Sequence, residues 1–191
     1  EARRVIRLWR AEQRASLPRS TPPLPEGRFR TLVADPPWKF RNDWGDGVAA
    51  DHYVPMETAA VVALGVGDLA APDAHLYLWV PGSLLPEALT VCGEWGFDYK
   101  ALLTWVKPGL GLGNYWRVAT EHIVFGVRGR LDTQAKDLRN WFNAPRARHS
   151  AKPDEFYELV ERASPGPYID LFARRPRLRG YFAGHTHRNR V

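Results

Sequence analysis

The sequence has a single cysteine and no long apolar run, and each of these shortages excludes a class of protein. Among 191 residues there is one cysteine, Cys92, so an intrachain disulfide and a cysteine-based metal cluster are both excluded. No apolar run approaches the length of a membrane span, and no signal-peptide pattern is visible. We therefore expect a protein of a reducing compartment, by default the cytoplasm, that does not interact with membranes.

Basic charge and tryptophan are plentiful by comparison. The net charge is +6 with a pI near 9.7, and arginines crowd at both ends and between Arg139 and Arg148. This charge favours a polyanionic partner, because each phosphate that is neutralised releases counterions. Eight tryptophans provide core and, beside arginine, stacking surfaces.

Three segments are expected along the chain. Residues 1–17 predict a helix with a strongly basic surface, and residues 18–28 form a proline-rich linker. Residues 29–191, with 45% hydrophobic residues in the chain as a whole, are sufficient for one domain with a substantial core.

Within the third segment, apolar runs alternate with helical patterns. The runs typical of buried strands are Thr31–Ala34, His75–Val80, Ala101–Val106, His122–Val127 and Tyr168–Phe172, with a shorter one near Tyr181. Helical spacing is present at Glu57–Leu64, Ser83–Trp95 and Pro153–Arg162. The alternation predicts an α/β fold, a mainly parallel sheet with helices on both faces, whose ligands bind at the carboxyl ends of the strands.

The most informative motif, Asp35-Pro36-Pro37-Trp38, directly follows the first of these runs. Proline has no N–H and a fixed φ, so we expect the carbonyls of Pro36 and Pro37 to be free of ladder pairing and to point outward. With the carboxylate of Asp35 they would accept both hydrogens of an exocyclic amine on a planar base. Trp38 would stack on that base, an interaction worth roughly 1–3 kcal/mol.

A second group of residues lies near the C-terminus. Lys152 precedes a predicted helix and Asp170 lies at the end of a predicted strand, which places an ammonium and a carboxylate near the same edge of the sheet. This pair suits a zwitterionic amino-acid ligand, with Lys152 for its carboxylate and Asp170 for its amine or for the lysine itself. Two long glycine-rich loops, Arg41–Val54 and Lys107–Asn114, are candidates for lids or binding segments.

Taken together, these motifs resemble a known family, the adenine-N6 methyltransferases that use S-adenosyl-L-methionine and carry the Asp-Pro-Pro-Trp signature. The family includes the catalytic subunit of the eukaryotic messenger-RNA adenosine methyltransferase. The similarity runs from about Phe29 to Tyr181 through A-D-P-P-W (34–38), L-Y-L-W-V (76–80), T-W-V-K (104–107), E-H-I-V-F-G-V-R-G (121–129), S-A-K-P-D-E (150–155), S-P-G (164–166) and I-D-L-F-A-R (169–174). It implies a Rossmann-like methyltransferase domain in permuted order, with the catalytic strand before the cofactor strand, and transfer of methyl to N6 of adenine in nucleic acid, with DNA slightly favoured over RNA.

The resemblance also assigns roles residue by residue. The catalytic group is Asp35, Pro36, Pro37 and Trp38, and the substrate pocket is bordered by Lys39, Trp105, Lys107 and Glu121. S-adenosylmethionine would contact Asp35, Lys152, Asp170, Phe172, Arg174, His185 and Thr186. The chain departs from the family where Gly184-His185-Thr186 replaces the usual Gly-Asn-Glu or Gly-Asn-Gln, although imidazole and hydroxyl groups still hydrogen-bond a purine.

Other functions stay open at this point. A non-catalytic nucleic-acid-binding subunit of a methyltransferase complex would keep the same fold, and methylation of another base such as cytosine would use a similar pocket. The family includes heterodimers as well as single-chain enzymes, so a homo- or heterodimer is possible. Three scattered histidines, His149, His185 and His187, have no cysteine partner, and no metal site is expected.

Overall fold

The computed structural model describes residues 26–39, 55–111, 113, 115–146 and 152–171. The predicted N-terminal helix, the linker as far as residue 25, the Arg41–Val54 loop and the apolar run near Tyr181 lie outside the described residues.

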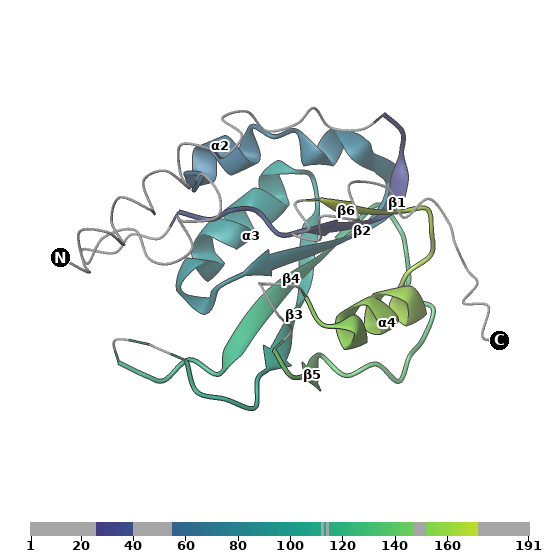
Figure 1. Cartoon of the computed structure of the whole chain (residues 1–191). Helices are drawn as coiled ribbons and strands as arrows, with labels where there is room; N and C mark the ends of the chain where they lie inside the picture. Colours follow the sequence, from purple (N-terminus) through teal and green to yellow (C-terminus); the bar gives the residue numbers. More distant parts are fainter. Residues whose placement is uncertain (1–25, 40–54, 112, 114, 147–151, 172–191) are drawn as a thin grey trace.

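The described residues form six strands and three α-helices (Figure 1). The strands are β1 (Phe29–Ala34), β2 (Ala70–Val80), β3 (Asp98–Val106), β4 (Thr120–Arg128), β5 (Trp141–Asn143) and β6 (Tyr168–Leu171). The helices are α2 (Thr58–Val62), α3 (Leu85–Glu94) and α4 (Asp154–Ala163), with short 3₁₀ turns at Val66–Leu69 and Gly82–Leu84. Each apolar run and each helical pattern predicted in this part of the chain coincides with one of these elements, whereas β5 was not predicted.

The sheet is mixed, but five of its six strands run in one direction, so it is mainly parallel as expected, with β4 as the exception. Its strand order is β5-β3-β4-β2-β1-β6. The pairs β1–β2, β1–β6 and β3–β5 are parallel, but β4 is antiparallel to both β2 and β3. No helical pattern separates β3 from β4 in the sequence, and without a crossover element the chain returns beside β3 in the opposite direction.

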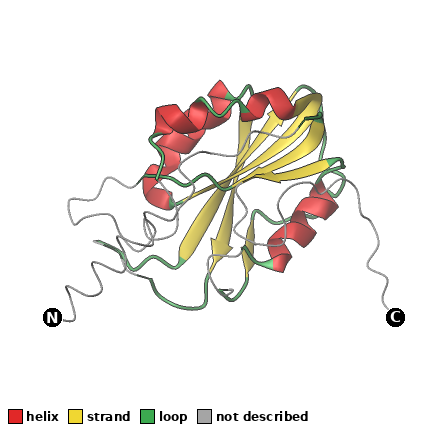
Figure 2. Ribbon diagram, turned by 45° about the horizontal axis from the view of Figure 1, so that its top comes forward, coloured by secondary structure: helices red, strands yellow, loops and turns green. Residues whose placement is uncertain are grey.

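The helices cover both faces of the sheet, as expected (Figure 2). On one face, Leu76 and Leu78 of β2 pack in the same cluster as Val61 of α2 and Val91 of α3. On the other face, the alternate residues of β2 pack against α4 in a second cluster that includes Tyr77, Trp79, Phe156 and Val160. Because both faces are covered, the second half of β2 is one uninterrupted buried run.

Helix α4 shows how the sequence produces this packing. Phe156, Val160 and Ala163 are buried at helical spacing and form its inner side. Asp154 and Glu155 lie in the first turn and Arg162 in the last, where each charge interacts favourably with the helix dipole. Pro153 precedes the first turn as the N-cap residue, so the helix begins two residues after Lys152, whose position is thereby fixed beside the sheet.

Candidate active site

The candidate site lies at the edge of the sheet where β1 and β3 end. Asp35 follows the last residue of β1 and Lys107 follows the last residue of β3. Because β4 runs in the opposite direction, its first residues lie at this same edge, and Glu121 is paired with Trp105 near the end of β3. The reversal of one strand thus brings a second carboxylate next to the predicted one.

The turn after β1 is fixed by backbone hydrogen bonds. The N–H of Asp35 donates to the carbonyl of Leu171 in β6 at 3.1 Å, and the N–H of Trp38 donates to the carbonyl of Pro36 at 2.8 Å. The N–H of Met56 donates to the carbonyl of Pro37 at 2.7 Å. The expectation that both carbonyls are free of ladder pairing is therefore wrong for Pro37 but holds for Pro36, whose hydrogen bond lies within the turn. Pro37 pairs with the segment before α2, while the oxygen of Pro36 keeps a second lone pair.

Trp38 packs in the core in this arrangement. Its side chain is 4% exposed, and its indole N–H donates to the carbonyl of Trp79 at 2.8 Å. The buried indole anchors the turn to β2, and stacking on a base stays a prediction for this residue. Lys39 is directed to an ion pair with Glu57 at 2.6 Å, and its role in substrate binding also stays a prediction.

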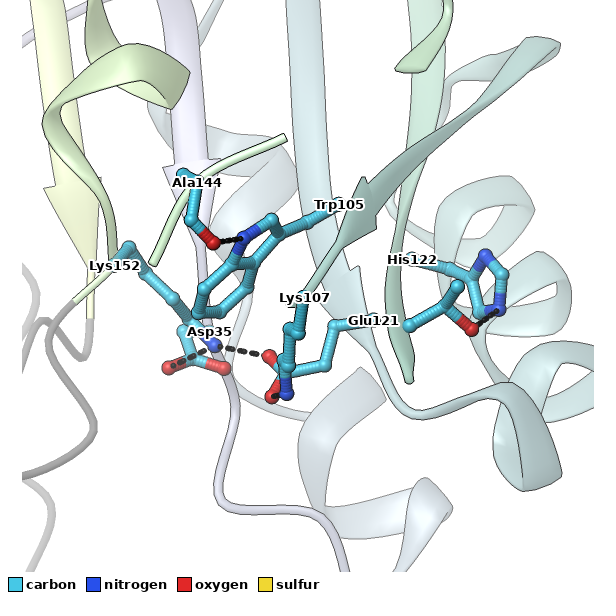
Figure 3. A network of polar contacts seen from close by, with 8 residues as sticks. Asp35, Trp105, Lys107, Glu121, His122, Ala144 and Lys152 are labelled. Carbon is cyan, nitrogen blue, oxygen red and sulfur yellow. Dashed lines mark hydrogen bonds and ion pairs between the residues drawn. The ribbon is translucent and has the colours of Figure 1, made fainter. Parts of the chain in front are cut away.

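Four charged side chains of alternating sign form a chain across the site (Figure 3). The ammonium of Lys152 lies 3.2 Å from Asp35 Oδ2 and 3.2 Å from Glu121 Oε2. The other oxygen of Glu121 accepts a hydrogen bond from Lys107. The sequence predicted that Lys152 and Asp35 belong to one site, but it did not predict that Glu121 connects both lysines.

Burial and the attraction between opposite charges shift the pKa values of these groups in opposite directions. For Lys152, burial lowers the pKa, but the charges of Asp35 and Glu121 outweigh burial and raise the pKa above its usual value. For Glu121, burial raises the pKa, but the charge of Lys152 and the hydrogen bond from Lys107 bring it below the usual value. Both groups are therefore charged at neutral pH.

Two tryptophans form the wall behind the charges. The Lys152 ammonium lies 4.2 Å from the ring centroid of Trp79, and the Lys107 ammonium lies 4.6 Å from that of Trp105. The two rings meet edge to face with centroids 6.1 Å apart, and the Trp105 N–H donates to the carbonyl of Ala144 at 2.9 Å. Trp105 was expected at the site, whereas Trp79 was missed although its place in L-Y-L-W-V signals a buried strand end beside Asp35.

The expected cofactor residues are only partly described. Asp170 accepts a hydrogen bond from the hydroxyl of Tyr157 in α4 at 2.8 Å, so Tyr157 is a site residue that sequence reasoning did not identify. Phe172, Arg174, His185 and Thr186 lie outside the described residues, and their roles stay predictions.

His122 lies on β4 next to Glu121 and was also missed. Its ring nitrogens lie within hydrogen-bond distance of Thr104 (3.2 Å) and Thr120 (3.4 Å), and burial lowers its pKa. Within the described parts of the chain, no group of three or more histidine, cysteine, aspartate or glutamate side chains could bind a metal ion. His149, His185 and His187 lie outside those parts.

Chemically, the site offers both signs of charge against an aromatic wall. Two carboxylates and two ammonium groups neutralise one another, so a zwitterion entering the site would exchange one ion pair for another. The carboxylate of Asp35 and the second lone pair of the Pro36 carbonyl oxygen are acceptors that lie one residue apart on the turn. In the described segments, no helix is both long and apolar enough to cross a membrane.

Comparison with known proteins gives consistent matches. The model of the family described as MT-A70 matches residues 29–184. The type II methyltransferase M.MunI of a Mycoplasma species is 26% identical over 175 residues, which are 80% of this chain and 75% of that protein. A putative N(6)-adenosine-methyltransferase MT-A70-like protein of Medicago truncatula is 30% identical over 157 residues, 78% of this chain.

The human N(6)-adenosine-methyltransferase catalytic subunit METTL3 is 28% identical over 158 residues, again 78% of this chain. The chain spans only about a quarter of the two larger relatives, 24% of the Medicago protein and 26% of the human one. These similarities therefore concern about a quarter of each of those two proteins.

Proposed function

The chain belongs to the MT-A70 family, and from this premise we propose that it is an S-adenosylmethionine-dependent methyltransferase that modifies the N6 amine of adenine in nucleic acid. The observation that carries the proposal is the carboxylate of Asp35 at the end of β1, 3.2 Å from the ammonium of Lys152. Two relatives are named as N(6)-adenosine methyltransferases, and the basic charge of the chain suits a polyanionic substrate. The mixed sheet covered by helices is compatible with a Rossmann-like methyltransferase domain.

The donors and acceptors at the site fit the methionine end of the cofactor. An ammonium group has three donors, and the contacts of Lys152 with Asp35 and Glu121 leave one for a carboxylate. The carboxylates of Asp35 and Asp170 are the acceptors for an α-amine. When bound, S-adenosylmethionine supplies an electrophilic methyl group on a sulfonium.

Asp35 would act on the amine of adenine by position rather than by strong basicity. The lone pair of that amine is delocalised into the ring, so the nitrogen reacts only when it pyramidalises. Acceptors that hold its hydrogens favour this change and stabilise the positive charge that develops on the nitrogen. Asp35 and the Pro36 carbonyl are such acceptors, and the proton that the methyl group replaces is lost afterwards to water.

The arrangement of the lysines keeps the site ready for this role. Lys152 fixes the carboxylate of Asp35 from one side, while Glu121, itself held by Lys107, fixes Lys152 from the other. Preorganised groups of this kind do not have to reorient during the reaction. In a duplex the target base must also be flipped out, which costs a few kcal/mol that a single strand avoids.

The test is incorporation of labelled methyl from S-adenosylmethionine into matched single- and double-stranded DNA and RNA, followed by nucleoside analysis. We expect N6-methyladenine in at least one substrate, and Asp35→Ala should reduce kcat by at least about 100-fold, the effect of removing one preorganised electrostatic contact. Asp98→Ala, an exposed carboxylate at the other end of β3, is the control and should keep full activity.

Three results would contradict the proposal: no labelled adenine in any of the four substrates, label in another base, or an Asp35→Ala variant with the turnover of the wild type. Calorimetric titration of S-adenosylmethionine into the wild type separates the enzyme from a non-catalytic subunit that has lost the cofactor. Binding is expected for the wild type, and Asp35→Ala, which keeps Lys152 and Asp170, should still bind the cofactor, although more weakly.

A further inference from the structure

The loop between β3 and β4 is a hairpin that leaves the sheet directly from the candidate site. The N–H of Lys107 donates to the carbonyl of Ala119 at 2.7 Å, and the N–H of Gly111 donates to the carbonyl of Val118 at 2.8 Å. Its two legs begin beside Lys107 and Glu121, which are themselves in contact. Figure 1 shows this segment extending away from the body of the sheet.

The hairpin presents large apolar side chains to solvent. Tyr115 is 96% exposed, Trp116 is 86% exposed and Leu110 is 76% exposed. Scattered single hydrophobic residues on a surface need no explanation, but several on one short segment indicate an interaction surface. Aromatic rings at these exposures contribute little to the stability of the fold, which favours a role in binding.

The charge of the hairpin is of one sign. Residues 107–119 contain Lys107 and Arg117 and no acidic residue. The guanidinium of Arg146 lies against the hairpin. Its Nη2 atom is 3.2 Å from the position that a Cβ on Gly111 would occupy. Just before β5, which pairs with β3, the guanidinium of Arg139 lies 5.5 Å from the ring centroid of Trp141. Exposed rings interleaved with arginines are the pattern that binds single-stranded nucleic acid, with bases on the rings and phosphates on the cations.

We propose that this hairpin binds the nucleotides that flank the target adenine, with Tyr115 and Trp116 stacking on unpaired bases and Arg117 and Arg146 contacting phosphates. The inference rests on the proposed function and adds to it a binding site for the flanking strand.

The reach of the hairpin sets which nucleotides it contacts. Trp116 is five residues from Glu121, so the two Cα atoms are at most roughly 18 Å apart in an extended chain. Even at the stacked spacing of about 3.4 Å per nucleotide, that upper limit is covered by about five nucleotide steps. A long single strand with its target base in the site therefore reaches the rings, whereas a trinucleotide centred on the target offers only one nucleotide on each side.

The test compares kcat and KM for a single-stranded 20-nucleotide substrate and for a trinucleotide, each with one adenine. Trp116→Ala and Tyr115→Ala should each reduce kcat/KM for the 20-mer by about 5-fold to 150-fold, the range that corresponds to the loss of one base stack. The change should be in KM, with kcat preserved, and kcat/KM for the trinucleotide should not change. Trp116→Phe keeps a stacking ring and should restore most of the loss.

Two further measurements complete the test. Tyr99→Ala, a half-exposed tyrosine at the other end of β3, is the matched control and should behave as the wild type. Arg117→Gln should weaken binding of all sequences and make the slope of log K against log salt shallower by about 0.7, the contribution of one contact to a single strand.

The outcomes separate this inference from the proposed function. If the wild type methylates the 20-mer and the hairpin variants match it, the inference is wrong and the proposed function stands. Equal losses on the 20-mer and the trinucleotide would also overturn the inference, as would a change of oligomeric state in sedimentation without loss of affinity, which would make the hairpin a protein interface. A wild type that neither binds nor methylates nucleic acid would overturn both.

Discussion

Removing the ammonium at the centre of the ion chain is the most direct test of the site. In Lys152→Met an aliphatic side chain of similar length is kept and only the charge is lost. Asp35 Oδ2 and Glu121 Oε2 each lie 3.2 Å from Lys152 Nζ, so they are at most twice that distance, about 6.4 Å, apart. Without the lysine, two charges at about 6.4 Å repel by about 2.6 kcal/mol at an effective dielectric constant of about 20.

Removing one partner of a fully buried ion pair costs about 3–5 kcal/mol. The side chains here retain between 15% and 31% of their exposure, which reduces that cost. We therefore expect the free energy of unfolding to fall by about 2–4 kcal/mol at pH 7.5. Lys100→Met, which breaks an exposed pair with Asp98 at 3.4 Å, is the control and should cost less than about 0.5 kcal/mol.

The dependence of stability on pH follows from the pKa shifts of Glu121 and Lys152. The pKa of Glu121 is below its ordinary value of 4.5, so its stabilising contribution is complete above that pH and is lost as the pH falls through the folded-state value. The pKa of Lys152 is above its ordinary value of 10.5, so its contribution is complete below that pH and is lost only in stronger alkali. Between these limits the two groups give the wild type no pH dependence of stability.

In Lys152→Met, by contrast, protonation of one carboxylate in mild acid relieves the repulsion, so the difference from the wild type should shrink between pH 7.5 and about pH 5. The difference in free energy of unfolding is measured by urea unfolding at both pH values, followed by tryptophan fluorescence, with the m-values compared. Adding Asp35→Asn to Lys152→Met should recover part of the loss. A loss below about 0.5 kcal/mol, or one that is the same at both pH values, would refute the assignment.

Two further predictions concern the fold itself. Burial lowers the pKa of His75 below its ordinary value of 6.5, so the wild type should lose stability as the pH falls below about 6.5. In urea unfolding, His75→Gln should make the free energy of unfolding depend less on pH in this range, and an unchanged dependence would contradict the reasoning. In Gly126→Ala the new Cβ would lie 2.8 Å from Cys92 Sγ, so we expect a loss of about 1–3 kcal/mol from overpacking. Cys92→Ala should suppress part of that loss, and independent, additive effects would argue against the contact.

The strands of this domain were predictable because both faces of the sheet are covered. Residues such as Leu76–Val80 have no polar side to present, and a continuous apolar run identifies them. The same property hides their direction, since an apolar run has the same pattern in either orientation. β4 was therefore located correctly, but its reversed direction was not predicted. β5, with only three residues beside Arg139 and Asn140, is too short to give a pattern.

The site residues that directly follow or precede a predicted element were predictable, whereas the contacts that require the reversed direction of β4 were not. Asp35 follows a strand and Lys152 precedes a helix, and both positions follow from the sequence pattern. The contact of Glu121 with Lys152 requires the start of β4 to lie at the edge where β1 ends, which follows only from its reversal. The partner of Asp170, the hydroxyl of Tyr157, depends likewise on how α4 packs on the sheet.

The reversal of β4 also explains why the charged site and the exposed hairpin occur together. A parallel connection after β3 would need a crossover element over one face of the sheet. Because the chain turns back instead, its loop projects from the sheet edge, and the first residues of β4 bring Glu121 to Lys152, the lysine that contacts Asp35. One change of strand direction thus supplies the carboxylate that fixes Lys152 and leaves Tyr115 and Trp116 exposed beside the reaction centre. A sheet with β4 parallel would have neither feature at this edge.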